Sequence, residues 1–174
     1  MMNLTRLAVL PLLVCAAAST ALSYDWNQQL QQSPVAFGAR VDAGYTLGTK
    51  DSIDYGLSGE LLFPLVSTFR LRTQVLRVAI LSGNSSLITF NSGLTLDVLA
   101  GLPIPRLAVL PYAYAGGGLV TQERVVGYDV RGGLGAEGSI AGITKAFGEL
   151  GINHTYAVTH VTRIMAGVGA RFGK

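Results

Sequence analysis

The chain has 174 residues, which is the size of one ordinary domain. Only 13% of its residues are charged and 49% are apolar, whereas soluble proteins carry about 25% charged residues, so a well-solvated surface is hard to build from this composition. The formal net charge of +3 is a small excess without a cluster of Lys or Arg, which argues against a nucleic-acid-binding surface.

Residues 1–23 have the pattern of a secretory signal peptide. Arg6 precedes the apolar run Leu7–Ala18, and small residues permit cleavage after Ala21 or after Ser23. The apolar run is too short to span a bilayer as a helix, and no later segment reaches 18 consecutive apolar residues. The sole cysteine, Cys15, lies in this segment, so we expect the mature chain to have no disulfide and no thiolate metal site. We also expect no cofactor.

Residues 24–34 are polar and aperiodic, which predicts an N-terminal tail. From Val35 to Gly48 apolar and polar residues alternate strictly, as in a strand with two unequal faces. Seven further segments alternate in the same way, at about 54–65, 69–75, 88–101, 107–121, 128–137, 143–154 and 163–172. Turn residues separate them, and none has the 3.6-residue period of a helix. We therefore predict an all-β fold, an eight-stranded antiparallel up-and-down transmembrane β-barrel over residues 35–173.

Two segments fit the alternation less well. Arg77 breaks the phase of the third, which predicts either a β-bulge near Leu76 or a position for Arg77 at a membrane interface. The fifth is apolar on both phases near its start, although Tyr112 and Tyr114 share one phase.

The polar phase of the strands carries equal numbers of cations and anions. Such a balance is typical of a closed interior, where each buried charge needs a partner. Most other residues of this phase are small, and small residues leave room for long side chains in a narrow lumen. The predicted luminal charge network consists of Arg40, Asp42, Glu60, Arg70, Arg72, Asp97, Asp129, Arg131, Glu137, Glu149, Arg163 and Arg171. We expect it to brace the barrel, with the gating of a polar path as the alternative.

Aromatic residues of the apolar phase lie near the strand ends, as in the girdles at lipid–water interfaces. This placement predicts that the apolar phase faces lipid. The predicted lower girdle is Phe37, Phe63, Phe69 and Phe172, and the upper girdle is Tyr45, Tyr55, Phe90 and Tyr128.

Three stretches carry a resemblance to a known family: Pro111–Gly118, Gly132–Glu137 and the closing Gly167–Phe172. Together with the signal peptide and the eight alternating segments, they resemble small OmpA/OmpX-type outer-membrane barrels. The resemblance implies a bacterial outer-membrane location and a monomer in the lipid bilayer. It also implies that the barrel-assembly machinery reads Phe172 as the terminal aromatic, although Gly173 and Lys174 follow it here.

Two motifs suggest chemistry. Gly133–Gly138 matches the phosphate-binding pattern G-x-G-x-x-G, but it lies inside an alternating strand and opens no helix, so we interpret it as luminal glycine. His154 and His160 raise the alternative of a metal pair or a lipid-modifying barrel enzyme, but the H-x-S pairing of outer-membrane lipid A deacylases is missing.

We expect a non-enzymatic outer-membrane barrel with a structural role in the envelope. At eight strands its lumen should be narrow and filled by side chains. Besides the lipid-modifying enzyme, the sequence leaves open a soluble lipocalin-like barrel that binds an apolar ligand. That barrel would show the same alternation with a charged outer face.

Overall fold

The structure, a computed structural model, describes residues 35–48, 53–66, 68–82, 87–91, 94–122, 125–141, 144–157 and 160–173. Within these ranges the side chains of 75–91, 122 and 141 are not described. The predicted signal peptide and N-terminal tail lie outside the described residues.

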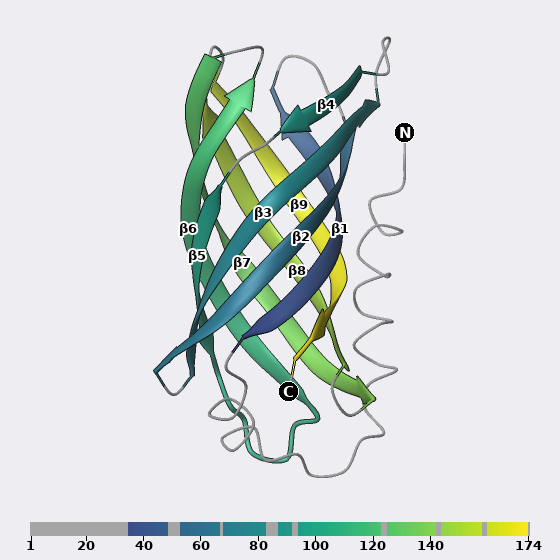
Figure 1. The fold of residues 1–174 in the computed structure, drawn as a ribbon, viewed down its shortest axis with the longest axis vertical. Helices are drawn as coiled ribbons and strands as arrows, with labels where there is room; N and C mark the ends of the chain where they lie inside the picture. Colours follow the sequence, from purple (N-terminus) through teal and green to yellow (C-terminus); the bar gives the residue numbers. More distant parts are fainter. Residues whose placement is uncertain are drawn as a thin grey trace.

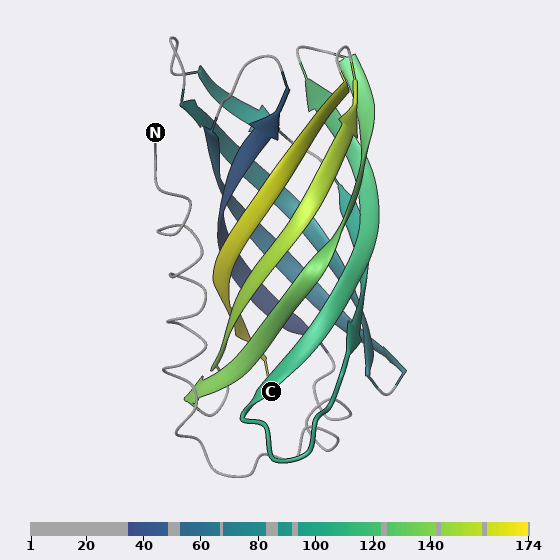
Figure 2. The same cartoon turned by 180° about the vertical axis from the view of Figure 1, so that it is seen from behind.

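The strands form one closed antiparallel ring (Figures 1 and 2). β4 pairs with the second half of β3 and β5 with its first half, so β4 and β5 are two parts of one barrel strand. Pairing of β2 with β3 and of β1 with β9 closes the ring, which confirms the predicted eight-stranded up-and-down barrel. The segments are β1 (Ala36–Leu47), β2 (Ile53–Val66), β3 (Phe69–Ser82), β4 (Leu87–Asn91), β5 (Thr95–Gly101), β6 (Val109–Gln122), β7 (Val125–Ala141), β8 (Thr144–Tyr156) and β9 (His160–Phe172).

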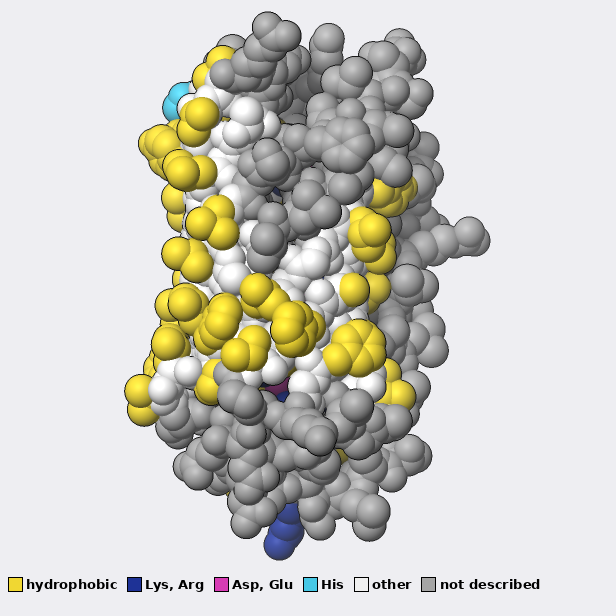
Figure 3. Space-filling view, viewed as in Figure 1, with side chains coloured by type: hydrophobic (Ala, Val, Ile, Leu, Met, Phe, Trp, Pro, Cys, Tyr) yellow, Lys and Arg dark blue, Asp and Glu magenta, His cyan; other side chains and the backbone are white. Residues whose placement is uncertain are grey.

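Side-chain burial follows the two-residue period of the sequence. In β5, for example, Thr95, Asp97 and Leu99 are buried, whereas Leu96 and Val98 are exposed. Buried residues point into the barrel and exposed ones point outward, because successive side chains of a strand lie on opposite faces. Figure 3 shows hydrophobic side chains standing along the described outer wall.

A β-bulge interrupts β3, in agreement with one of the two explanations predicted for Arg77. Glu60 of β2 pairs with Gln74, but the preceding Gly59 pairs with Leu76, so Val75 is the extra residue. This insertion changes the phase of β3 and places Arg77 opposite Ser58.

β1 begins and β9 ends at the same end of the barrel, the end marked C in Figure 1, which we call the lower end. The lower end carries the connections 67–68, 102–108 and 142–143, and the upper end carries 48–52, 83–86, 123–124 and 157–159. In the 102–108 connection Arg106 has a positive φ of 69°. The described residues form no helix that is long and apolar enough to span a bilayer.

Candidate functional site

All twelve charged residues of the predicted luminal network point into the barrel. Ten of them are at most 7% exposed, and the side chains of Arg131 and Arg163 are 12% and 19% exposed. The structure adds two further charges to the inward face. Asp54 is buried beside Arg163, and Lys145 lies opposite Arg171 in the β8–β9 register. Among the described side chains the lumen therefore holds seven cations (six plus Lys145) and seven anions (six plus Asp54), a neutral set.

Glu149 of β8 is the centre of the network. Its carboxylate accepts hydrogen bonds from Arg40 of β1, from Arg72 Nη1 of β3 at 2.5 Å and from Arg171 Nη2 of β9 at 3.3 Å. The Tyr112 hydroxyl of β6 donates to the same carboxylate at 2.6 Å. One buried carboxylate thus connects five different strands across the lumen.

A second group of contacts lies toward the lower end. Arg171 donates from Nε to Glu60 at 2.6 Å and from Nη1 to Glu137 at 2.5 Å. Glu137 also accepts a hydrogen bond from Arg70 Nη1 at 2.6 Å. The Arg171 guanidinium lies 3.9 Å from the centre of the Phe147 ring, so an aromatic face covers the cation while three carboxylates satisfy its donors.

A third group lies toward the upper end and centres on Asp97. Its carboxylate accepts from Arg72 Nε at 2.8 Å, and from Nε and Nη2 of Arg131 at 2.7 and 2.6 Å. Arg131 further donates to Gln74 and Thr95, each at 2.6 Å. The fork of Arg131 on Asp97 is the bidentate geometry that fixes both orientation and distance.

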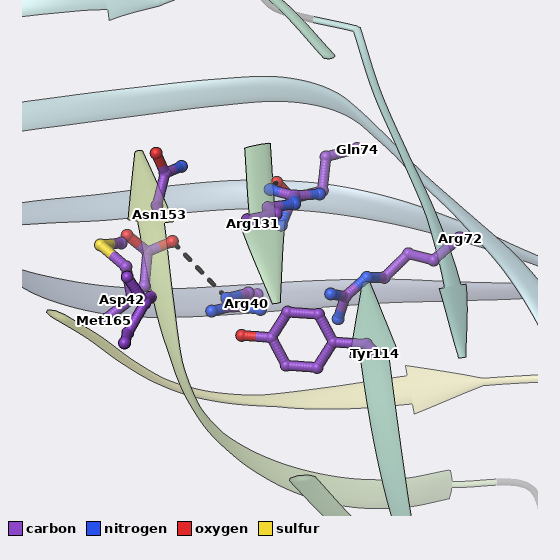
Figure 4. Close-up of a pocket in the computed structure, with 9 residues that line it drawn as sticks. Arg40, Asp42, Arg72, Gln74, Tyr114, Arg131, Asn153 and Met165 are labelled. Atoms are coloured by element: carbon purple, nitrogen blue, oxygen red, sulfur yellow. Dashed lines mark hydrogen bonds and ion pairs between the residues drawn. The ribbon is translucent and has the colours of Figure 1, made fainter. Parts of the chain in front are cut away.

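A small polar cavity lies between the Glu149 and Asp97 groups (Figure 4). In this view the Arg40 guanidinium lies between Asp42 and the Tyr114 ring. The volume of the cavity is about 20 Å³, measured as the space that can hold the centre of a water molecule. That space suits about one ordered water, so the cavity is a gap in a filled lumen and too small for an organic solute.

Inward-facing glycines make the room that the largest luminal side chains need. A Cβ on Gly135 would come within 2.5 Å of the Tyr112 ring, and one on Gly169 would come within 2.5 Å of the Phe147 ring. A Cβ on Gly151 would collide with the Tyr114 hydroxyl and with a backbone oxygen. The G-x-G-x-x-G match of residues 133–138 lies within β7 and opens no helix, and its Gly135 leaves room for the Tyr112 ring.

The predicted girdle residues lie on the outward face. Phe37 and Phe172 are direct partners at the lower end, and Tyr45 lies opposite Ile53 and Ile164 at the upper end. The Phe90 side chain lies outside the described part of the chain. The outward-facing, exposed members are Phe37, Tyr45, Tyr55, Phe69, Tyr128 and Phe172, and Phe63 is half-buried.

The two histidines also lie on the outward face at the upper end. His154 Nδ1 is 2.7 Å from the Thr162 hydroxyl, and its ring contacts those of Tyr156 and His160. None of these described partners of His154 is a serine or a carboxylate. The described residues contain no group of three or more His, Cys, Asp or Glu side chains arranged to hold a metal ion.

Several luminal residues were not assigned from the sequence. Tyr112 and Tyr114 point inward and are 1% and 6% exposed, although the apolar start of this strand left its phase open. Phe147 and Asp54 share the phases of Glu149 and Glu60, so strict use of the two-residue period would have found them. The same period also predicts that Lys145 faces inward, since it shares the phase of Glu149.

Comparison with known proteins supports the fold. No family model matches the chain, and no curated protein matches it in sequence. The crystal structure of Neisserial surface protein A superposes with a TM-score of 0.64 at 10% identity, covering 82% of this chain and 98% of that one. The N-terminal β-barrel domain of Pseudomonas aeruginosa OprF gives 0.49 at 14% identity, covering 81% and 100%. A de novo designed transmembrane β-barrel gives 0.45 at 13% identity, covering 88% and 100%. Only the first likeness, with its TM-score above 0.5, supports a shared fold.

Proposed function

We propose that this protein is a non-enzymatic, monomeric β-barrel of the bacterial outer membrane that has a structural role in the envelope. The observation that carries the proposal is that the described charged side chains of the barrel strands lie on the inward face and not on the outward face. The outward faces of the described strand side chains carry no Asp, Glu, Lys or Arg, whereas the inward faces carry fourteen such residues in equal numbers of each sign.

A bilayer is the environment in which this wall is stable. Large apolar side chains stand outward along the strands, among them Val41, Leu57, Leu96, Val130 and Leu150, each between 48% and 57% exposed. In water this surface would be an aggregation site, but in hydrocarbon it is solvated. The unbroken strands have 12 to 17 residues, more than the 9–11 that a tilted transmembrane strand requires. The soluble lipocalin-like alternative requires a charged outer face, which the described strands do not have.

The lumen supports a bracing role. Several of its ion pairs join strands that are not neighbours in the ring, such as β3 to β8 through Arg72 and Glu149, and β2 to β9 through Glu60 and Arg171. Such ion pairs across the lumen resist both flattening and opening of the barrel. Ion pairs neutralise much of the buried charge, so the interior needs little water to solvate it, although Nε and Nη2 of Arg70 and Nη2 of Arg72 are buried without a hydrogen-bond partner.

Phe172 is the last residue of β9, points outward and is 47% exposed. This position suits the proposed recognition of the C-terminal strand by the barrel-assembly machinery. The lipid-modifying alternative depends on His154 and His160, whose described contacts are a threonine hydroxyl and aromatic rings. No observation favours it over the structural role.

Gel mobility tests the membrane barrel. Full-length protein extracted in detergent should migrate faster unboiled than boiled, because a closed barrel stays folded in mild detergent and is more compact than the unfolded chain. It should also co-fractionate with outer membranes. Release into buffer without detergent, together with an unchanged mobility on boiling, would contradict the proposal.

A further inference from the structure

The two rims of the outer wall differ in chemistry. Among the described residues, the outward aromatic side chains near the lower end are phenylalanines: Phe37, Phe63, Phe69 and Phe172. Near the upper end, where the Phe90 side chain lies outside the described part of the chain, the described ones carry a hydrogen-bonding group: Tyr45, Tyr55, Tyr128, His154, Tyr156 and His160. A phenylalanine side chain has no hydrogen-bonding group, whereas tyrosine and histidine side chains can form hydrogen bonds with polar headgroups.

Four of the upper residues form one continuous aromatic cluster, which we call the β7–β9 ring cluster: Tyr128, His154, Tyr156 and His160. Tyr128 and Tyr156 stack with their ring centres 4.6 Å apart. His154 and His160 lie 4.3 and 5.2 Å from the Tyr156 ring and 6.1 Å from each other. The Thr162 hydroxyl fixes the orientation of His154 through Nδ1, and His160 is exposed.

The histidines are the only described outward-facing strand side chains that can carry a positive charge. The charged residues on the strands packed against them, Asp129 and Arg131 of β7 and Arg163 of β9, point into the lumen. In the register, His154 lies opposite Val130 and Thr162, and His160 lies opposite Tyr156. Tyr45 is the nearest titratable outward residue on β1, the strand that follows β9 in the ring. Lys50 and Asp51 belong to the upper connection 48–52, outside the described residues.

We propose that the β7–β9 ring cluster binds anionic phosphate headgroups of the leaflet at the upper end, and that binding strengthens when His154 and His160 protonate. The inference rests on the bilayer placement proposed above. Aromatic belts lie at the depth of lipid headgroups. At that depth an imidazolium N–H and a tyrosine hydroxyl are donors for phosphate oxygens, and charge-assisted hydrogen bonds are about twice as strong as neutral ones. Histidine changes charge between pH 5 and 8, so the contact is sensitive to pH.

Lipid retention in native mass spectrometry tests the proposal. Full-length protein in detergent micelles is given equal phosphatidylglycerol and phosphatidylcholine, and the ratio of the two bound lipids is compared at pH 5.5 and pH 8.0. We expect the preference for phosphatidylglycerol to be several-fold larger at pH 5.5. The double variant His154→Gln, His160→Gln should lose this pH response. The matched control Tyr55→Gln, which removes an upper-rim ring on β2, should keep it.

Equal ratios at both pH values, or a pH response that survives in the double variant, would overturn the proposal. Loss of the pH response in EDTA would also overturn the proposal, because it would show that the two imidazoles bind a metal ion. Displacement of the lipid by inorganic phosphate would do the same, because it would show that they bind a free anion. Each variant is checked for its heat-dependent mobility. If the double variant does not fold, His160→Gln alone, at an exposed position, supplies the comparison. If the gel mobility of the wild-type protein did not change on boiling, the proposed membrane placement itself would be contradicted. This outcome is distinct from a failure of the headgroup proposal.

Discussion

At the scale of single residues, large luminal side chains pack over glycines of other strands. Tyr114 fills the space over Gly151, and Phe147 fills the space over Gly169. Each ring can pack inside a narrow barrel because the facing strand presents only backbone. These glycines therefore have a steric role, which differs from the conformational role of Gly48, whose φ is +138°.

Substituting Gly151 by alanine should lower the free energy of unfolding by about 1–3 kcal/mol, because the added methyl group overlaps the Tyr114 hydroxyl and a backbone oxygen. The measurement is urea unfolding in lipid vesicles, followed by tyrosine and tryptophan fluorescence. Gly59→Ala is the matched control. No atom lies within 4 Å of a Cβ at that position, so the free energy should stay unchanged or rise by up to about 1 kcal/mol. Equal losses for both variants would contradict the steric role.

At the scale of single strands, two of the irregularities in the barrel change how β3 and β6 pair with their neighbours. The bulge at Val75 lets β3 change phase between its two partners, β5 and β4. The second irregularity is the break between β4 and β5. The amide of Leu119 donates to the carbonyl of Leu94 at 3.1 Å, and beyond this bond the described part of β6 pairs only with β7.

Hydrogen exchange should reveal this break. Amides along an antiparallel strand point alternately to its two neighbours, so the amide of Thr121 points to the same side as that of Leu119, toward β4. No ladder pair joins the described residues of β4 and β6. We expect the Thr121 amide to exchange about 100-fold faster than the Gly117 amide, which lies within the β5–β6 ladder. NMR of the protein in micelles measures both, and similar protection would show that a ladder closes this region.

At the scale of the whole molecule, stability depends on ion pairs and hydrogen bonds that cross the lumen. Backbone hydrogen bonds join only neighbouring strands, whereas Glu149 joins β8 to β1, β3, β6 and β9 through Arg40, Arg72, Tyr112 and Arg171. Removing its charge leaves several buried guanidinium groups short of an anion, and an unpaired buried charge is costly.

Glu149→Gln should therefore lower the free energy of unfolding by about 3–5 kcal/mol. The same urea unfolding in vesicles measures it. Asp54→Asn is the matched carboxylate-to-amide control at the upper mouth, where the ion pair with Arg163 is long at 3.8 Å and partly open to solvent. Its loss should be clearly smaller, because solvent screens that pair. A larger loss for Asp54→Asn would show that Glu149 is not the centre of the network.

The sequence by itself determined the fold class, the strands and the face on which most residues lie. Strict alternation and charge balance suffice for this, because a two-residue period fixes the face of each side chain, as for Arg40, Asp42 and Phe37. The same rule could not set the phase of the strand that contains Tyr112 and Tyr114, since both of its phases begin apolar.

Only the tertiary structure decided which luminal charges meet. Glu149 and Arg40 are 109 residues apart, and their contact depends on barrel closure and strand register, which no local pattern encodes. The same holds for the upper rim. Tyr128, His154, Tyr156 and His160 come from three strands, and they form one cluster only because β7, β8 and β9 pair in this register.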